Sequence, residues 1–370
     1  MRVLVTGGAG FIGSHLVDRL LEAAHDVRVL DSLDPQVHDG WPSYLSDEAE
    51  RIHGDVRDHD AVARALDDVD LLVHLAAAVG VGQSMYEIER YTSVNAIGAA
   101  VVLEEATRVR DHLEKVVVAS SMSIYGEGAY RCPAEGTPQS PTPRPDDQLA
   151  RREWEVRCPS CGAELEPAGT PESKPLQPLS IYAVGKRDHE EMFLAWARAY
   201  KVPATALRFF NVYGPRQALS NPYTGVAAIF ASRLLNGRAP VIFEDGRQSR
   251  DFVHVSDIVA GIALALSPGR GDLDALNLGT GVATSIAEVG EVLSRKLEVD
   301  AQPEIRNEFR AGDIRHCFAD ISRAREALGF EPRVSFEDGM DELGDWLRGR
   351  TATDSVETAT AALAERGLTS

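Results

Sequence analysis

Over the first 210 residues of the chain, the spacing of apolar residues alternates between the pattern of a strand and the pattern of a helix. Short β-rich runs are followed by stretches with an apolar residue every three or four positions. Strands that alternate with helices indicate a parallel sheet with helices on both faces, so we predict an α/β fold of the Rossmann-type, doubly wound class. The expected strands are 3–6, 27–31, 51–53, 71–75, 115–120 and 204–209, and the expected helices are 15–24, 60–66, 95–109 and 182–200.

Two stretches break this rhythm. Pro, Gly, Glu and Arg replace periodic apolar positions over residues 130–178, which predicts an insertion or lid. After Gly214 the pattern is irregular, and 370 residues exceed the usual size of one hydrophobic core. We therefore expect a sheet domain and a smaller C-terminal lobe. The expected boundaries are 1–211 for the sheet domain, to which 252–267 returns, 212–350 for the lobe and 351–370 for a tail.

Three glycines at G-x-x-G-x-x-G spacing lie between the first strand and the first helix. These are Gly7, Gly10 and Gly13, with Phe11 and Ile12 between the last two. Glycines allow a tight turn and a close approach to a pyrophosphate, which then lies at the helix N-terminus. The motif predicts a dinucleotide site. A plain glycine turn is the alternative.

Acidic residues at the ends of the next strands suggest which dinucleotide binds. Asp31 ends the second strand, where a carboxylate bonds ribose hydroxyls and repels a 2′-phosphate, so NAD is favoured over NADP. Asp31 could instead cap the following loop. Asp55 and Val56 could reach the adenine, although Asp-Val pairs are also common on surfaces. The remaining residues assigned to NAD are Leu75, Ala76, Ala77, Asn95, Tyr182 and Lys186.

The pattern Y-x-x-x-K opens the helix expected at 182–200. The spacing of four places Tyr182 and Lys186 on one helix face. A nearby Lys cation and the nicotinamide charge would lower the pKa of the Tyr182 phenol, which could then exchange a proton with a substrate hydroxyl. Ser121 follows an apolar strand, at the end where ligands bind in such sheets, and can bond the same hydroxyl.

The charge and hydropathy of the chain exclude several partners. Its net charge of −19 argues against nucleic acid or an anionic membrane as the main partner. No apolar run approaches the roughly 20 residues of a membrane-spanning helix. The sequence opens directly on a strand pattern, without the features of a signal peptide, so we expect a soluble, cytoplasmic protein.

The motifs together resemble a known family. In order they are GGAGFIG, SSMSIYG, YAVGK, RFFNVYGPRQ and RDFVHVSD. Over residues 1–347 the chain is similar to the NAD-dependent nucleotide-sugar epimerase/dehydratase family, which are extended short-chain dehydrogenases/reductases, and within it to dTDP-L-rhamnose 4-epimerase-like and UDP-sugar 4-epimerases. The resemblance implies that Ser121, Tyr182 and Lys186 are catalytic. It also implies a homodimer packed through the helices 95–109 and 182–200.

The same resemblance implies contacts to a nucleotide-diphosphate sugar. Asn211 and Arg250 would contact phosphate and substrate, and Arg310 and Asp313 would lie near the nucleotide. Arg side chains supply the forked donors that a diphosphate needs. For both of these arginines an ordinary surface position is the alternative. The other expected substrate residues are Ser123 and Arg216.

The residues after Ser121 point to one reaction. Related 4,6-dehydratases carry Asp-Glu immediately after this position, and glucuronate decarboxylases carry a Glu two positions after it. Here Met122 and Ser123 follow, which favours NAD-dependent 4-epimerisation through a transient 4-keto sugar. A decarboxylase or dehydratase that uses an acid from elsewhere, and a non-catalytic NAD-binding regulator, remain alternatives. The uncharged stretch 76–85 suits a dTDP-6-deoxyhexose, and UDP-hexose or UDP-glucuronate remains open.

Three of the four cysteines lie in the insertion. The pattern C-P-x-x-G occurs at 132–136 and again at 158–162, with Cys132 and Glu135 in the first copy and Cys158 and Cys161 in the second. Paired loops of this form suit a tetrahedral structural zinc. A loop held by packing alone is the alternative. Cys317 is expected to be a buried thiol.

Overall fold

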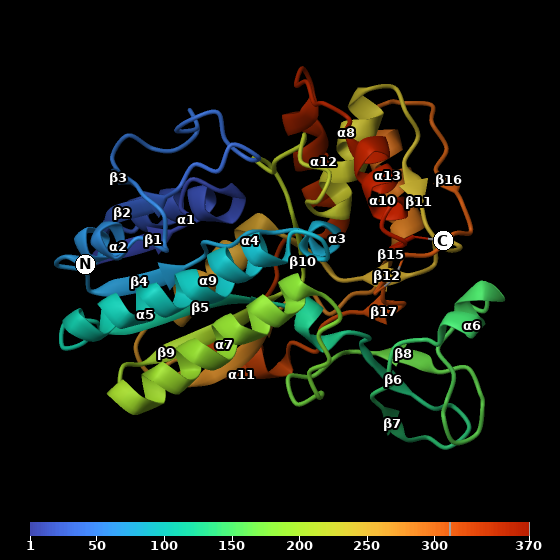
Figure 1. Ribbon diagram of the computed structural model, residues 1–370, viewed down its shortest axis with the longest axis horizontal. Helices are drawn as coiled ribbons and strands as arrows, with labels where there is room; N and C mark the ends of the chain where they lie inside the picture. Colours follow the sequence, from blue (N-terminus) through green and yellow to red (C-terminus); the bar gives the residue numbers. More distant parts are fainter. Residues whose placement is uncertain (311, 370) are drawn as a thin grey trace.

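The computed structural model describes residues 1–310 and 312–369, and it has the predicted α/β architecture. One seven-stranded parallel sheet forms its centre (Figure 1). The strand order is β14-β9-β5-β4-β1-β2-β3, so the chain reverses its direction of progress between β1 and β4. The strands are β1 (Arg2–Thr6), β2 (Asp26–Asp31), β3 (Glu50–His53), β4 (Leu71–His74), β5 (Lys115–Ser121), β9 (Ala204–Phe209) and β14 (Asp274–Leu278).

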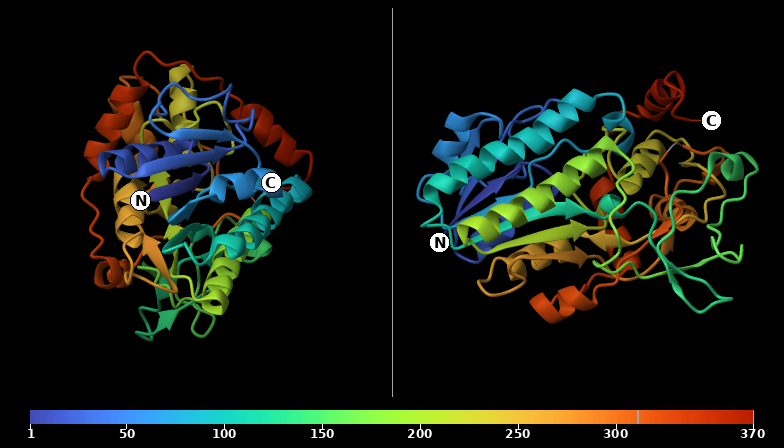
Figure 2. Two further views of the ribbon diagram at one scale, coloured as in Figure 1. Left: turned by 90° about the vertical axis from the view of Figure 1, so that its left-hand side faces the viewer. Right: turned by 60° about the horizontal axis from the view of Figure 1, so that its bottom comes forward.

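Helices cover both faces of this sheet (Figures 1 and 2). Because side chains alternate across a strand, Leu4 packs toward one face while Val3 and Val5 pack toward the other. The first face carries α2 (His59–Leu66), α5 (Gly98–Val109) and α7 (Ile181–Tyr200). The second face carries α1 (Phe11–Glu22), α9 (Val255–Ala265) and α11 (Ser322–Leu328).

Segments from the second half of the chain complete the sheet domain. The strand β13 (Phe252–His254) leads into α9, which packs against α1. The edge strand β14 pairs with β9 and lies within the stretch that we assigned to the smaller lobe. The paired residues of β14 and β9 therefore lie about 70 positions apart in the chain.

The smaller lobe has a hydrophobic core of its own. Phe230, Leu293 and Leu343 are among its buried residues. They belong to α8 (Val226–Leu235), α10 (Ile286–Lys296) and α12 (Phe336–Leu347). Short strand pairs border these helices: β10 (Asn211–Tyr213) with β13, β11 (Val241–Ile242) with β16 (Glu304–Ile305), and β12 (Ser249–Arg250) between β15 (Thr284–Ser285) and β17 (His316–Cys317). In the tail, α13 (Val356–Ala364) buries Ala359 and Leu363.

The predicted insertion is a separate small sheet. It lies beside β12 and β17 at the right of Figure 1, away from the helices of the large sheet. Its strands, in the order β7-β6-β8, are β6 (Ala129–Arg131), β7 (Pro138–Gln139) and β8 (Glu166–Ala168).

The remaining elements of the chain are α3 (Val81–Ser84), α4 (Ile88–Thr92), a π-helical turn (Ser93–Ile97), a 3-10 turn (Met122–Tyr125) and α6 (Asp146–Ala150). Among the described residues, no helix is both long and apolar enough to span a membrane.

A neutral histidine is buried where β4 meets α7. The ring of His74 stacks on Phe193 at 5.1 Å between ring centroids, and its Nδ1 lies 2.9 Å from the Thr6 hydroxyl. Burial, together with the Lys186 charge, lowers the pKa of His74 to about 3.

This histidine makes the stability of the fold dependent on pH. Below about 6.5 the unfolded chain protonates His74 while the folded chain does not, so stability is lost as the pH falls from 6.5 toward 3. Between pH 7.5 and 5.5 we expect the wild type to lose about 1 kcal/mol more of unfolding free energy than His74→Phe. Urea unfolding of both proteins at the two pH values measures this difference. Equal losses would contradict it.

Candidate functional site

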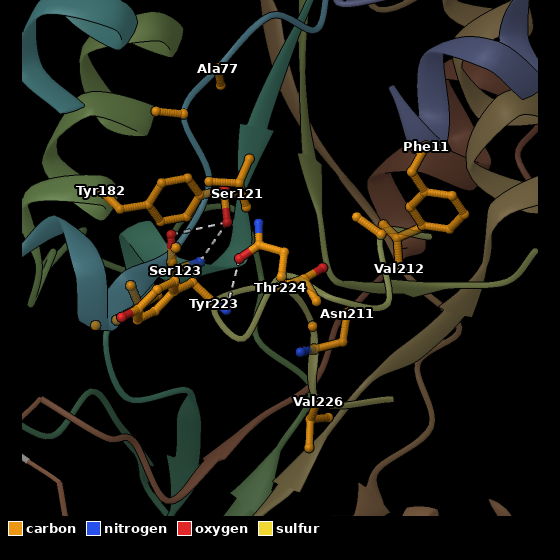
Figure 3. A pocket seen from close by; sticks show the side chains of 18 of the residues that line it. Phe11, Ala77, Ser121, Ser123, Tyr182, Asn211, Val212, Tyr223, Thr224 and Val226 are labelled. Carbon is orange, nitrogen blue, oxygen red and sulfur yellow. Dashed lines mark hydrogen bonds between the residues drawn. The ribbon is translucent and has the colours of Figure 1, made fainter. Parts of the chain in front are cut away.

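One large cavity lies at the carboxyl ends of the sheet strands and continues into the smaller lobe. Its volume is about 890 Å³, within the range of cofactor and ligand pockets. Figure 3 shows the two sides, with Ser121 and Tyr182 from the sheet domain facing Asn211, Tyr223 and Thr224. The cavity therefore brings together both parts of the chain that the sequence motifs indicated.

The glycine loop forms one wall of this cavity. Gly7 has a φ of +71°, and a Cβ there would lie 2.8 Å from the backbone nitrogen of Ala76. A Cβ on Gly13 would lie 2.3 Å from the carbonyl oxygen of Gly7. The helix α1 begins here with Gly10 as its N-cap, without a side chain bonded to its first N–H groups. The first N–H groups of α1 therefore have no side-chain partner, and they lie beside backbone that leaves no room for a Cβ. Such a helix N-terminus fits a pyrophosphate.

Asp31 lies at the rim of the same wall. Its Oδ2 accepts a hydrogen bond from the backbone nitrogen of Ala9 at 3.0 Å, and its Oδ1 accepts one from that of Leu33 at 2.9 Å. Asp31 thus caps the loop that follows β2, which was the alternative to a cofactor role, and it also lines the cavity. A carboxyl group fixed in this position suits ribose hydroxyls.

The other residues assigned to the cofactor divide into two groups. Phe11, Ile12, Asp55, Val56, Leu75, Ala76 and Ala77 line the cavity. Asn95 is not among the lining residues: its side chain accepts a bond from the backbone nitrogen of Ala78 and donates one to the Ala78 oxygen, and its contact with the cofactor stays a prediction. Asn95 lies in the π-helical turn, where it holds the loop that forms the cavity wall.

The three expected catalytic residues meet at the end of β5. The Ser121 hydroxyl accepts hydrogen bonds from the Ser123 nitrogen at 3.2 Å and from the Ser123 hydroxyl at 3.0 Å (Figure 3). Ser180 caps the N-terminus of α7, which places Tyr182 in the first turn of the helix, beside the cavity. One turn later, the Lys186 ammonium donates to the Ala119 oxygen at 2.9 Å.

The electrostatics of this group differ from the sequence expectation. Burial raises the pKa of Tyr182 to about 12, and a hydrogen bond to Ser121 opposes this shift. Burial also lowers the pKa of Lys186 to about 7. In the protein alone, then, desolvation is the main cause of both pKa shifts, and Lys186 is not among the causes of the Tyr182 shift. Tyr182 is a neutral proton donor in this state.

Asn211 and Arg250 lie on the lobe side of the cavity. Among the described residues, no hydrogen-bond partner reaches the buried Asn211 Oδ1, and the residue lines the cavity. Such an unpaired acceptor fits a ligand donor. The Arg250 guanidinium donates to the carbonyl oxygens of Ser249, Arg315 and Ile314 at 2.8, 3.1 and 2.7 Å. Three of its five donors are thus used to fix its position, and the others are available to a ligand.

Arg310, Asp313 and Ser123 also line the cavity, whereas Arg216 does not. Arg310 pairs with Asp313 at 2.9 Å and stacks over the Phe243 ring. Arg216 pairs instead with Asp18 of α1 at 2.7 Å. This ion pair ties the second half of the chain to α1, and the expected contact of Arg216 with substrate stays a prediction.

Sequence reasoning missed part of the cavity lining. Tyr223, Thr224, Gln248 and Phe243 come from loops without a motif. The tail contributes Ala359 and Leu363 of α13, although it was expected to lie outside the lobe. The only local signal was its weak helical pattern, since a docking position depends on the surface that receives the helix.

A second cluster lies in the insertion, in a different part of the fold. The side chains of Cys132, Glu135, Cys158 and Cys161 converge, with their ligand atoms all within 4.8 Å of one another. Cys317 is buried elsewhere and contacts the Thr170 hydroxyl at 3.7 Å, as expected for a packed thiol.

Comparisons with known proteins agree with this geometry. Residues 3–148 match the model of the NAD dependent epimerase/dehydratase family, and residues 162–343 match that of GDP-mannose 4,6 dehydratase. The chain is 35% identical to a dTDP-L-rhamnose 4-epimerase of Burkholderia thailandensis, with 94% of each chain covered. It is 33% identical to a UDP-glucose 4-epimerase of Mycolicibacterium smegmatis, with 95% of this chain and all of the relative covered.

Solved structures agree as well. A Thermotoga maritima UDP-glucose 4-epimerase with UDP-glucose superposes with a TM-score of 0.77 at 32% identity, covering 94% of this chain and 99% of the other. The similarity to these relatives thus extends over nearly the whole length of the chain, including the residues that line the cavity. This chain is an enzyme that belongs to the NAD-dependent epimerase/dehydratase family of nucleotide-sugar enzymes.

Proposed function

We propose that this enzyme interconverts two nucleotide sugars that differ in configuration at carbon 4. The observation that carries the proposal is that the acidic side chains around the cavity already have hydrogen-bond or ion-pair partners. Of the described residues that line it, five are acidic. Elimination of water or removal of carbon dioxide needs a carboxylate or other acid/base near carbon 5 or 6, whereas epimerisation at carbon 4 does not.

Each of these five carboxylates is already engaged. Asp31 is bonded to backbone N–H groups, and the other four form ion pairs with arginines. These pairs are Asp34 with Arg90, Asp55 with Arg57, Glu244 with Arg144, and Asp313 with Arg310. Met122 and Ser123, at the positions where related dehydratases and decarboxylases carry acids, line the cavity without a carboxylate. Acid/base chemistry is therefore concentrated on Tyr182.

The residues of the chain can carry out each proton step. Bound NAD supplies a reversible hydride acceptor. Ser121 bonds the carbon 4 hydroxyl and orients it, while Tyr182 takes its proton on oxidation and returns it on reduction. The Lys186 ammonium lies one helix turn from Tyr182 and stabilises the phenolate that accepts this proton. Tyr182 is then a phenol while the 4-keto sugar exists, and it becomes a phenolate again when the proton is returned. The cavity extends into the lobe, which leaves room for the keto sugar to turn.

The wall beside the sugar favours a substrate without a charged group on the ring. Residues 77–82 line the cavity with small, uncharged side chains and backbone. A glucuronate carboxylate would need a cation there, since an unpaired charge is costly to bury. We therefore infer a neutral sugar, with a dTDP-6-deoxyhexose favoured over a UDP-hexose because the wall is apolar.

We further propose a cytoplasmic homodimer packed through α5 and α7. Ile88, Ile97 and Val184 lie on or beside this helix pair, and each exposes 42 to 54% of its surface. Exposed large apolar side chains at these positions suit association with a second copy.

A panel of nucleotide sugars tests the reaction. Purified enzyme is incubated with dTDP-6-deoxyhexose, UDP-hexose and UDP-glucuronate, and products are identified by mass and NMR. We expect a product of unchanged mass with inverted carbon 4, and the highest kcat/KM for the dTDP sugar. Loss of water or carbon dioxide would instead establish a dehydratase or decarboxylase, and no turnover would favour a binding protein.

Replacement of the phenol tests the proton-transfer role. Tyr182→Phe keeps the ring but removes the group that exchanges the proton, so we expect kcat to fall by about 100-fold or more while NAD remains bound. Tyr200→Phe, at the exposed far end of the same helix, is the matched control and should keep full activity. A near-normal rate in Tyr182→Phe would exclude this role.

The choice of cofactor depends on Asp31. We expect protein freed of nucleotide to bind NAD at least about tenfold more tightly than NADP, because a 2′-phosphate would face this fixed carboxylate. Asp31→Asn keeps the shape of the side chain and one acceptor oxygen for the loop, and it should reduce the ratio of the NAD affinity to the NADP affinity. Calorimetric titration with both dinucleotides measures it, and equal affinities in the wild type would refute the assignment.

A further inference from the structure

The two cysteine loops of the insertion repeat a longer pattern than C-P-x-x-G. Each copy reads Arg-Cys-Pro-x-x-Gly, and the fifth position is Glu135 in the first copy and Cys161 in the second. Both copies form hairpin turns. The first is closed by the pairing of Arg131 with Pro138, and the second by the pairing of Arg157 with Glu164. In both, seven positions separate the paired residues.

The backbone bonds of the two turns are also the same. The nitrogen of Cys132 bonds to the oxygen of Thr137 at 2.9 Å, and the nitrogen of Cys158 bonds to the oxygen of Ala163 at 2.8 Å. Each cysteine oxygen accepts a bond from the glycine four positions later, at 2.8 and 2.9 Å. The glycines, Gly136 and Gly162, have φ values of +67° and +75°. Two turns of one geometry thus present two pairs of side chains to each other.

The four presented side chains have the spacing of a tetrahedral metal site. The sulfur atoms of Cys132 and Cys161 are 3.6 Å apart. Two thiolates on one zinc with bonds of about 2.3 Å would be separated by about 3.8 Å. A disulfide would need about 2.05 Å, and all four cysteines are free. Glu135 completes the set, because its carboxylate oxygen lies within the same 4.8 Å limit.

Hydrophobic packing in the insertion is too sparse to explain this convergence. Its core consists of Tyr130, Cys132, Val156, Cys158 and Leu165, so two of the five members are the cysteines themselves. A unit of this size ordinarily needs a metal or a disulfide to fold. The exposed Cys161 and Glu135 nevertheless face the buried pair.

We propose that Cys132, Glu135, Cys158 and Cys161 bind one structural zinc ion that closes the insertion. Thiolate and carboxylate together suit zinc, which accepts both kinds of ligand in a tetrahedral arrangement. All four positions are filled by protein, so the ion orders the loops and leaves no position for a catalytic water. Three thiolates, one carboxylate and Zn²⁺ leave two negative charges, and Arg131 and Arg157 stand directly before the two first cysteines.

The zinc loops are joined to the large cavity by a buried charge network. Glu155, three positions before Cys158, accepts from the Arg315 Nε at 3.2 Å. Arg144 donates to Glu244 at 2.7 Å and to the Asp313 carbonyl oxygen at 3.2 Å. An ordered insertion therefore holds the backbone of Asp313, which lines the cavity.

Metal analysis of the intact enzyme is the first test. Protein purified without chelators should contain about one zinc per chain by elemental analysis, whereas Cys158→Ser should contain less than a tenth of that. Cys317→Ser is the matched control, because it removes a buried cysteine outside the cluster, and it should keep its zinc. Zinc-free wild type, or full zinc in Cys158→Ser, would overturn the proposal.

A substitution at the carboxylate position keeps the test valid if Cys158→Ser fails to fold. Glu135 is exposed, so Glu135→Ala and Glu135→Cys should both fold. Against a competing chromophoric chelator, we expect Glu135→Ala to lose zinc at least tenfold more readily than the wild type, and Glu135→Cys to hold it at least tenfold more tightly. Equal retention by the three proteins would exclude Glu135 as a ligand and overturn the four-ligand site.

Limited proteolysis shows whether the ion orders the loops. After treatment with chelator, new cleavages should fall within 132–165, while the sheet domain stays intact. Addition of zinc should restore protection. A cleavage pattern unaffected by chelation would show that packing alone holds the insertion, and would overturn the structural role.

Discussion

The site depends on a close backbone approach at the centre of the sheet. Strand β1 lies between β2 and β4, and the chain leaves it in the direction opposite to that taken after β4, which opens a crevice at the carboxyl ends of the strands. Gly7 and Gly13 make this crevice accessible, because a Cβ at either position would collide with backbone. The exposed helix end, the dinucleotide site and the position of Ser121 all follow from this geometry.

Desolvation sets the chemical character of the site. The five carboxylates around the cavity are neutralised by arginines or backbone donors, so they serve to hold the walls in place. Tyr182 and Lys186 stand in surroundings that disfavour their charged forms. A site whose lining carboxylates all have partners, with Tyr182 beside Ser121, is suited to moving one proton back and forth, and less suited to elimination.

The tail lines the cavity, and the insertion is linked to the cavity wall by buried ion pairs, although both are distant from the sheet motifs in sequence. The buried Arg315 connects Glu127 and Glu155 to Glu244, so the ordering of the insertion reaches the loop that carries Asp313. A buried cationic side chain is tolerated because several carboxylates surround it. On the other side, α13 covers the cavity with Ala359 and Leu363.

The sequence by itself determined the parallel sheet, its glycine loop, the placement of Tyr182 and Lys186 one turn apart on one helix, and the two C-P-x-x-G turns. All of these depend on spacings within one strand, one helix turn or one hairpin, where local geometry leaves little choice. The tertiary structure alone decided that Asn95 holds a loop, that Arg216 pairs with Asp18 and that the tail helix lines the cavity. Those outcomes depend on contacts across up to about 200 residues, and a side chain carries no local record of the surface it will meet after folding.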